Sequence, residues 1–202
     1  IDDETKSSLT AINNYMADVK QTISDFYRVA LQRDFARNFQ FRLLSINTGG
    51  ASAVTFDEND LVYLTAGTLP GRSITNVAVP YMGLNFNLPG IATYDGSEAY
   101  NLTFYCDAQS KIRRKFEDWS RDIFDDATST GNYFTPRQTA TIDMLQLDTQ
   151  LNRVSQYQLV GVSVRNVGAI DYNISATSGE IVNFTATVAY HYFRRLAPPR
   201  GQ

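Results

Sequence analysis

Residues 181–193 alternate between apolar and polar side chains with a period of two. One set of positions holds Asn183, Thr185 and Thr187, and the other set is apolar or aromatic: Val182, Phe184, Val188, Tyr190 and Tyr192. This period is typical of a β-strand that packs one face and leaves the other face wet. The segment therefore predicts a strand in a sheet with one packed face. Many β-sandwiches contain strands of this kind.

Shorter extended patterns precede this segment, at residues 39–47, 61–64, 101–106, 139–147 and 154–164. Residues 74–79 and 81–88 read as two strands or as one strand broken at Pro80, and Pro89-Gly90 reads as a turn. Strands follow one another without alternating helices, which argues against a doubly wound α/β fold. We expect a mainly β fold of the α+β class, with an antiparallel sandwich or barrel-like sheet domain.

Two segments have helical periodicity. The first carries a heptad stripe with spacing 3-4-3-4-3-4: Leu9, Ile12, Met16, Val19, Ile23, Phe26 and Ala30. The second carries one apolar face at offsets 0, 4, 7 and 11: Ile112, Phe116, Trp119 and Ile123. We expect the second helix to flank the sheets and to pack this face on the core. The first helix fits two interpretations, an amphipathic helix on its own domain or an arm that packs on a neighbouring subunit.

These patterns divide the chain into three parts. We expect an N-terminal helical arm at residues 1–33, a β domain at residues 34–197 and a flexible tail at residues 198–202. Residues 48–60 are small and polar and include Asp57 and Glu58, which indicates an exposed loop.

The side chains that usually carry catalysis do not form a recognisable motif. His191 is the single histidine, and no second histidine or cysteine stands at metal-ligand spacing from it. Cys106 lies in an apolar run and resembles a core residue more than a reactive thiol. The neighbouring carboxylates Glu117 and Asp118 point in different directions on a helix. We therefore expect no enzyme activity, no catalytic residue, no cofactor and no metal.

Charge and hydropathy restrict the partners. The chain has 18 basic and 21 acidic residues, a net charge of −3, and no dominant basic region, which disfavours tight binding of nucleic acid. No apolar run approaches eighteen residues, so we expect no membrane span. A single cysteine is compatible with a reducing compartment.

Five segments, in this order, resemble the tail tube proteins of contractile-tailed bacteriophages. Residues 102–119 form a strand that leads into a helix ending in Phe-x-x-Trp, at Phe116 and Trp119. Residues 159–168 are followed after a polar hairpin by residues 181–192. The other segments are residues 33–37, Leu69-Pro70 before Val79-Pro80, and residues 87–90. The resemblance covers roughly residues 34–193.

The resemblance implies a virion protein of the tail, assembled in the cytoplasm of the host bacterium. It implies homo-hexameric rings that stack into a tube, contacts with tail sheath and baseplate proteins, and passage of ejected DNA without specific binding. We expect the face of Asn183, Thr185 and Thr187 to line the channel. We expect contacts between subunits at the following residues: Leu9, Ile12, Met16, Val19, Ile23, Phe26, Asp57 and Glu58.

Two alternatives remain open. The long N-terminal helix and the expanded loop at residues 47–64 depart from a plain tube subunit, so a baseplate initiator or a tube-terminating protein of the same fold also fits. An unrelated β-sandwich binding module is a further alternative. Against it, Trp119 lies on the packed face of its helix, which leaves no obvious aromatic platform for a sugar.

Overall fold

The computed structural model describes residues 22–33, 35–50, 52–131, 138–175 and 177–196. The chain divides into two units, residues 1–39 and 40–202. Within the first unit the structure describes one helix, α2 (Ile23–Gln32). Thr22 caps it, because its hydroxyl accepts a hydrogen bond of 3.2 Å from the backbone N–H of Asp25. Most of the predicted heptad stripe and the predicted C-terminal tail lie outside the described residues.

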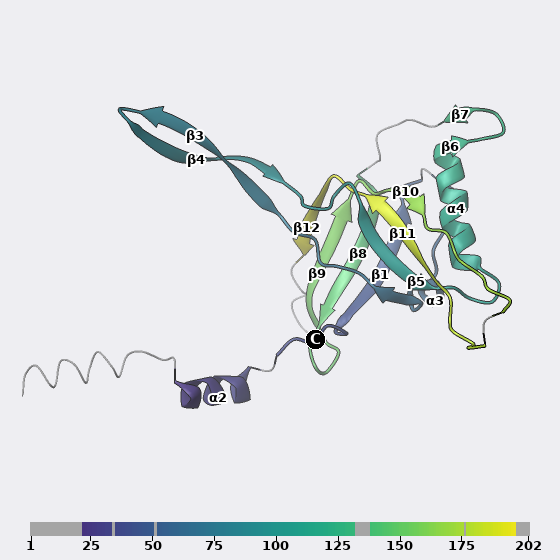
Figure 1. Ribbon diagram of the computed structural model, residues 1–202, viewed down its shortest axis with the longest axis horizontal. Coiled ribbons are helices and arrows are strands. Elements are labelled where there is room, and N and C mark those ends of the chain that lie inside the picture. The colour runs from purple at the N-terminus through teal and green to yellow at the C-terminus, as the bar shows by residue number, and fades with distance from the viewer. Residues whose placement is uncertain (1–21, 34, 51, 132–137, 176, 197–202) are drawn as a thin grey trace, which may run out of the picture. The chain divides into compact units, whose positions relative to one another are not determined.

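The second unit contains two four-stranded antiparallel sheets (Figure 1). The first has the order β1 (Phe41–Thr48), β8 (Ala140–Leu147), β9 (Arg153–Val160) and β12 (Tyr192–Leu196). The second has the order β10 (Ser163–Val167), β11 (Asn183–Ala189), β5 (Tyr100–Tyr105) and β2 (Leu64–Ala66). The predicted mainly β, antiparallel fold is confirmed.

One hydrophobic core joins the two sheets. The first sheet contributes Leu43, Ile142, Met144 and Leu159, and the second contributes Leu102, Phe104, Phe184 and Val188. Successive strand residues point to opposite faces, so each sheet turns one face inward. The period-two pattern thus gives a sandwich rather than a single open sheet.

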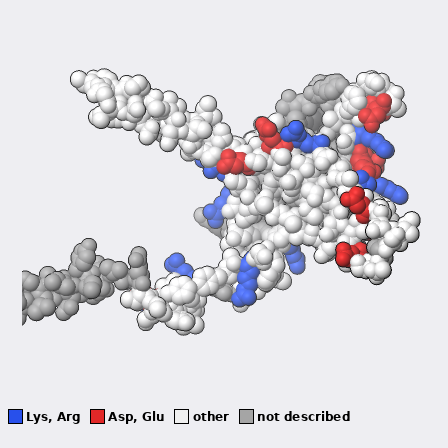
Figure 2. All heavy atoms as spheres, viewed as in Figure 1, with Lys and Arg blue, Asp and Glu red and all other residues white. Residues whose placement is uncertain are grey.

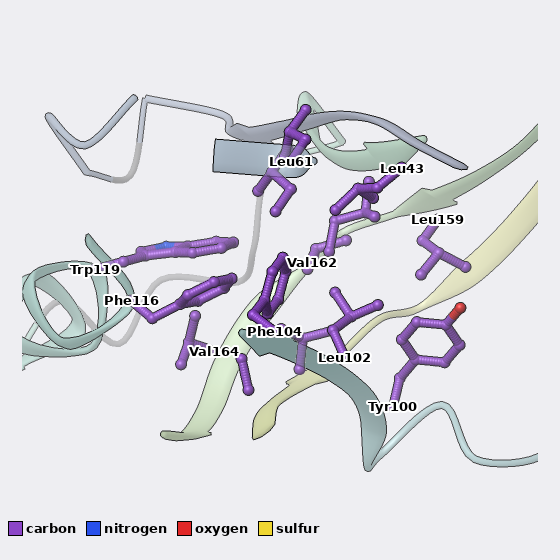
Figure 3. Packing of buried hydrophobic residues seen from close by; sticks show 14 of the residues in the cluster. Leu43, Leu61, Tyr100, Leu102, Phe104, Phe116, Trp119, Leu159, Val162 and Val164 are labelled. Carbon is purple, nitrogen blue, oxygen red and sulfur yellow. The ribbon is translucent and has the colours of Figure 1, made fainter. Parts of the chain in front are cut away.

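Helix α4 (Lys111–Ile123) packs on this core. Its Ile112, Phe116 and Trp119 are buried, and Ile123 is half-buried against the same cluster. Figure 3 shows the rings of Phe116 and Trp119 side by side, reaching from the helix toward Phe104. The Phe104 and Phe116 ring centres are 5.5 Å apart, a typical distance for packed aromatic rings.

Two segments that the period-two pattern predicts as single strands are each bent into two strands of different sheets. Residues 154–164 divide into β9 and β10 at Gly161, whose φ is +72°, and residues 181–193 divide into β11 and β12 at Tyr190–His191. The two bends adjoin, because the His191 N–H donates to the Val160 carbonyl at 3.0 Å. A strand that changes sheets at a bend keeps its alternation on both sides, so the pattern alone does not show the corner.

Strands β3 (Ser73–Tyr81) and β4 (Leu84–Thr93) form a separate two-stranded hairpin that extends away from the sandwich (Figure 1). The expected break at Pro80 and the expected turn at Pro89-Gly90 are wrong, since both lie inside strands. The turn falls instead at Met82 and Gly83, which both have positive φ, as a two-residue type I′ turn requires. Proline is tolerated here because each strand has one neighbour and leaves its other edge free.

The remaining elements are short. The acidic end of the loop predicted at residues 48–60 begins a short helix, α3 (Glu58–Leu61). After α4 the chain forms a small hairpin of β6 (Phe124–Asp125) and β7 (Thr130–Gly131). No helix in the described residues is long and apolar enough to cross a membrane.

Candidate assembly surfaces

Within the described residues, no three His, Cys, Asp or Glu side chains come together in a way that could hold a metal ion. His191 is exposed at the sandwich corner, and Cys106 is half-buried with its Sγ 3.3 Å from the Ser110 hydroxyl.

The outer face of the second sheet is polar. Asn183, Thr185 and Thr187 of β11 lie opposite Tyr105, Thr103 and Asn101 of β5 in the strand register. The Thr103 and Thr185 hydroxyls are 3.2 Å apart, and the Thr187 hydroxyl donates to the Asn101 side-chain carbonyl at 2.8 Å. The three residues predicted to line a channel therefore share one exposed or half-buried surface.

This polar face carries almost no charge. Strands β2, β5 and β11 contain no Asp, Glu, Lys or Arg, and β10 contains Arg165, whose guanidinium donates to the Glu98 carbonyl at 2.8 Å. The strands of the other sheet carry four arginines and one aspartate: Arg42, Arg153, Arg194, Arg195 and Asp143. The two outer faces of the sandwich therefore differ in charge.

The β3–β4 hairpin has two unlike faces. The pairs Val77–Leu88, Val79–Phe86 and Tyr81–Leu84 lie on one face, and the pairs Asn76–Pro89, Ala78–Asn87 and Pro80–Asn85 lie on the other. All six residues of the first set are exposed, Tyr81 and Leu84 at 65%. We call these six residues the hairpin apolar face. From Ser73 to Thr93 the hairpin contains no charged residue, and Figure 2 shows it without blue or red along its length.

Sequence reasoning did not identify this face as a contact surface. Its signal was nevertheless in the sequence, as a run of 21 residues in strands without a single charge. An uncharged strand pair normally lies in a core, and the exposure of this one indicates an interaction surface.

Helix α2 also exposes apolar side chains. Ile23, Phe26, Tyr27, Ala30 and Leu31 have the spacing i, i+3, i+4, i+7, i+8 of one helical face, and none of the helix residues is buried. We call these five residues the α2 apolar face. Ile23 and Phe26 belong to the predicted subunit contacts, whereas Leu9, Ile12, Met16 and Val19 lie outside the described residues. Their role stays a prediction.

Asp57 and Glu58, the other predicted contacts, lie at the start of α3. The Lys115 ammonium of α4 lies 2.5 Å from the Asp60 carboxylate and 3.4 Å from that of Asp57. Burial alone would lower the pKa of Lys115, but the hydrogen bonds and charges of Asp60 and Asp57 together raise it. Asp57 thus has a partner within its own chain, and its predicted role between subunits is untested.

A hollow of about 540 Å³ opens beside the edge strand β1. Its lining is largely apolar and includes Phe41, Leu43, Leu61, Leu145 and Leu147, together with Glu58, Arg42 and Arg153. Glu58 therefore borders an apolar depression, and exposed apolar surface of this kind marks interaction sites.

Comparisons with known proteins agree with this architecture. A family model described as phage tail tube protein matches residues 23–196. No curated protein sequence matches the chain. Among solved structures, a chain of the anti-feeding prophage baseplate matches with a TM-score of 0.53 at 14% identity, over 81% of this chain and 97% of the other.

Two chains from an extracellular contractile injection system named PVC match to a similar degree. The sheath/tube terminator gives a TM-score of 0.55 at 11% identity, over 82% of this chain and 99% of the other. A chain of the sheath–tube complex gives a TM-score of 0.50 at 11% identity, over 85% of this chain and 97% of the other. At these identities the matches establish the shared fold alone.

Proposed function

This chain belongs to the phage tail tube protein family, and on that premise we propose that it is a structural subunit whose hexameric rings stack into the channel through which DNA is ejected. The family is one of structural proteins. Because the family match covers residues 23–196, an unrelated β-sandwich binding module is no longer supported.

The nearly uncharged outer face of the second sheet is the observation that carries this proposal. Its Asn183, Thr185 and Thr187 would line the channel. Threonine and asparagine keep a surface wet, and their side chains offer no positive charge to DNA phosphates. A cationic lining would hold the DNA by releasing its counterions, whereas this lining would let it slide.

Ring formation accounts for the exposed apolar surfaces. The hairpin apolar face is too extensive and too free of charge to suit a subunit that stays alone in water. The sheets also end in the edge strands β1, β12, β10 and β2, and neighbours that pair or cover such edges remove an aggregation hazard. Sheath and baseplate proteins would contact the outside of the tube, in a virion tail assembled in the host cytoplasm.

Negative-stain microscopy of the purified full chain tests the proposal. We expect stacked rings with six-fold symmetry, or tubes, at high protein concentration. A protein that stays a ring-free monomer under these conditions would contradict it.

The channel assignment has a separate test. Asn183→Lys places a positive charge on the proposed lining, and Ser178→Lys places the same charge on an exposed loop residue as a control. We expect tubes of Asn183→Lys to retain duplex DNA that nuclease cannot reach, and to release it when salt is raised. Equal nuclease protection in both variants would mean that this face does not line the channel.

An initiator or terminator of the tube is a second candidate. Chains from structures of a baseplate and of a sheath/tube terminator match this chain with TM-scores of 0.53 and 0.55, slightly above the 0.50 of a chain from a sheath–tube complex. Deletion of residues 1–33 separates the candidates: if the intact chain forms only single rings and the deletion lets them stack, this is an end protein. Indefinite stacking of the intact chain would exclude that role.

A further inference from the structure

The hairpin apolar face needs a cover that the hairpin itself does not supply. A two-stranded hairpin is marginally stable in water unless a third strand or a helix packs on it. β3 and β4 form a sheet of two strands only. The free edges are poor places for a third strand, because Pro80 and Pro89 lack the N–H that a further ladder would need. A helix laid across the face would cover it without using these edges.

Helix α2 also has an exposed apolar face and needs another element to cover it. It is ten residues long, shorter than the length at which helices persist alone in water. Its N-terminus is capped, and Arg28 pairs with Asp25 at 3.0 Å, so local interactions favour the helix. Its apolar face nevertheless remains exposed, with Ile23 at 77% and Leu31 at 88%.

The two faces match in size. Ten helical residues extend about 15 Å, and the strand segment from Val77 to Tyr81 extends about 13 Å. Side chains from two strands about 4.8 Å apart form a strip that one helix can cover.

The two faces also match in charge. The hairpin apolar face has no charge within its own strands, and α2 keeps its Asp25 and Arg28 on the side away from its apolar face. Contact between the two faces would therefore bury apolar side chains on both elements without removing any charge from water.

We propose that helix α2 of one copy packs its apolar face on the hairpin apolar face of a second copy. The choice of a second copy rests on the proposed function, in which exposed apolar surfaces are covered by neighbouring subunits. The contact is head-to-tail, because each copy contributes a helix to one neighbour and receives a helix on its hairpin from another. Such a contact repeats around a ring or along a stack.

Disulfide trapping between two differently tagged full-length variants tests the contact. Both carry Cys106→Ala, which removes the single native cysteine. One adds Ala30→Cys on the α2 apolar face, and the other adds Val79→Cys on the hairpin apolar face. After mild oxidation of the mixture we expect a mixed-tag dimer as the main product. The matched pair Gln32→Cys and Asn87→Cys, on the opposite faces, should give at least tenfold less.

The proposal is overturned if the test pair and the control pair give equal yields. It is also overturned if a variant with both cysteines closes the disulfide within a single chain while the mixture gives none, because α2 would then cover its own hairpin. If the wild-type chain forms tubes but the oxidised mixture gives no mixed-tag dimer, the proposed contact is wrong and the proposed tube function still stands. If the wild-type protein never forms rings, the proposed tube function itself is wrong.

A charge substitution gives a second measurement. Phe86→Asp places a carboxylate on the hairpin apolar face, and Asn87→Asp places one on the opposite face of the same strand. We expect Phe86→Asp to abolish assembly while the purified protein unfolds like the wild type, and Asn87→Asp to assemble normally. Normal assembly of Phe86→Asp would contradict the proposed contact.

Discussion

Phe104 in the sandwich and Phe86 in the hairpin are both strand phenylalanines, but Phe104 is fully buried and Phe86 is 49% exposed. Phe104 lies between the Phe116 and Phe184 rings, at centroid distances of 5.5 and 5.6 Å. Phe86 lies opposite Val79 on a sheet of two strands with a bare face. The same side chain therefore stabilises the single copy in one region and remains available for a partner in the other.

Of the substitutions that compare these two regions, Phe116→Ala should have the largest effect on the free energy of unfolding. Phe116 is fully buried against Phe56, Phe104 and Trp119, so its removal leaves a cavity in the core. We expect the free energy of unfolding, measured with urea, to fall by about 3–5 kcal/mol. A loss below about 1 kcal/mol would mean that α4 is not part of the cooperative core.

Gly161→Ala should have the next largest effect on the free energy of unfolding. At φ +72° the backbone of a residue with a Cβ is strained, and the added Cβ would lie 2.1 Å from the His191 ring. We therefore expect the free energy of unfolding to fall by about 2–3 kcal/mol in the same assay. Gly83→Ala in the hairpin turn is the matched control, with φ +81° but no atom within 4 Å of the added Cβ. It should cost about 1 kcal/mol. Equal losses at the two glycines would show that the His191 contact is unimportant.

Lys115→Met tests the charged flank of the sandwich, which has no counterpart in the hairpin. It leaves the half-buried Asp60 without its cation, and we expect a loss of about 1–2 kcal/mol at neutral pH. The pKa of Lys115 is raised on folding, so its contribution is complete below the unfolded pKa and disappears as pH rises through the folded pKa.

The difference between wild type and Lys115→Met, measured by urea unfolding at a series of pH values, should therefore stay constant at neutral pH. It should shrink above about pH 10.4, the ordinary lysine value. A difference that instead grows at high pH would contradict the sign of this shift.

Phe86→Ala should have the smallest effect on the single copy. Its side chain is already half exposed in a peripheral hairpin, so the free energy of unfolding should change by no more than about 0.5 kcal/mol. Measurement at a concentration where the protein is monomeric removes any contribution from assembly. A loss comparable to that of Phe116→Ala would show that the hairpin apolar face is covered within one chain.

Several parts of this architecture follow from sequence periodicity. The offsets of Ile112, Phe116 and Trp119 predict a helix with one packed face, and these side chains are buried in α4. The alternation around Thr185 and Thr187 predicts a strand with one polar face, which β11 has. These features are local, because a period of 3.6 or of two arises wherever one side of an element is covered.

Other features depended on tertiary structure. The bends at Gly161 and His191, which move two strands from one sheet to the other, leave the alternation intact and are therefore invisible in it. The hairpin apolar face has the same pattern as a core strand, and only its surroundings show that no part of the described sandwich covers it. A sequence pattern determines that a face is apolar. Which element covers that face is a matter of packing between segments far apart in the chain, or between copies of it.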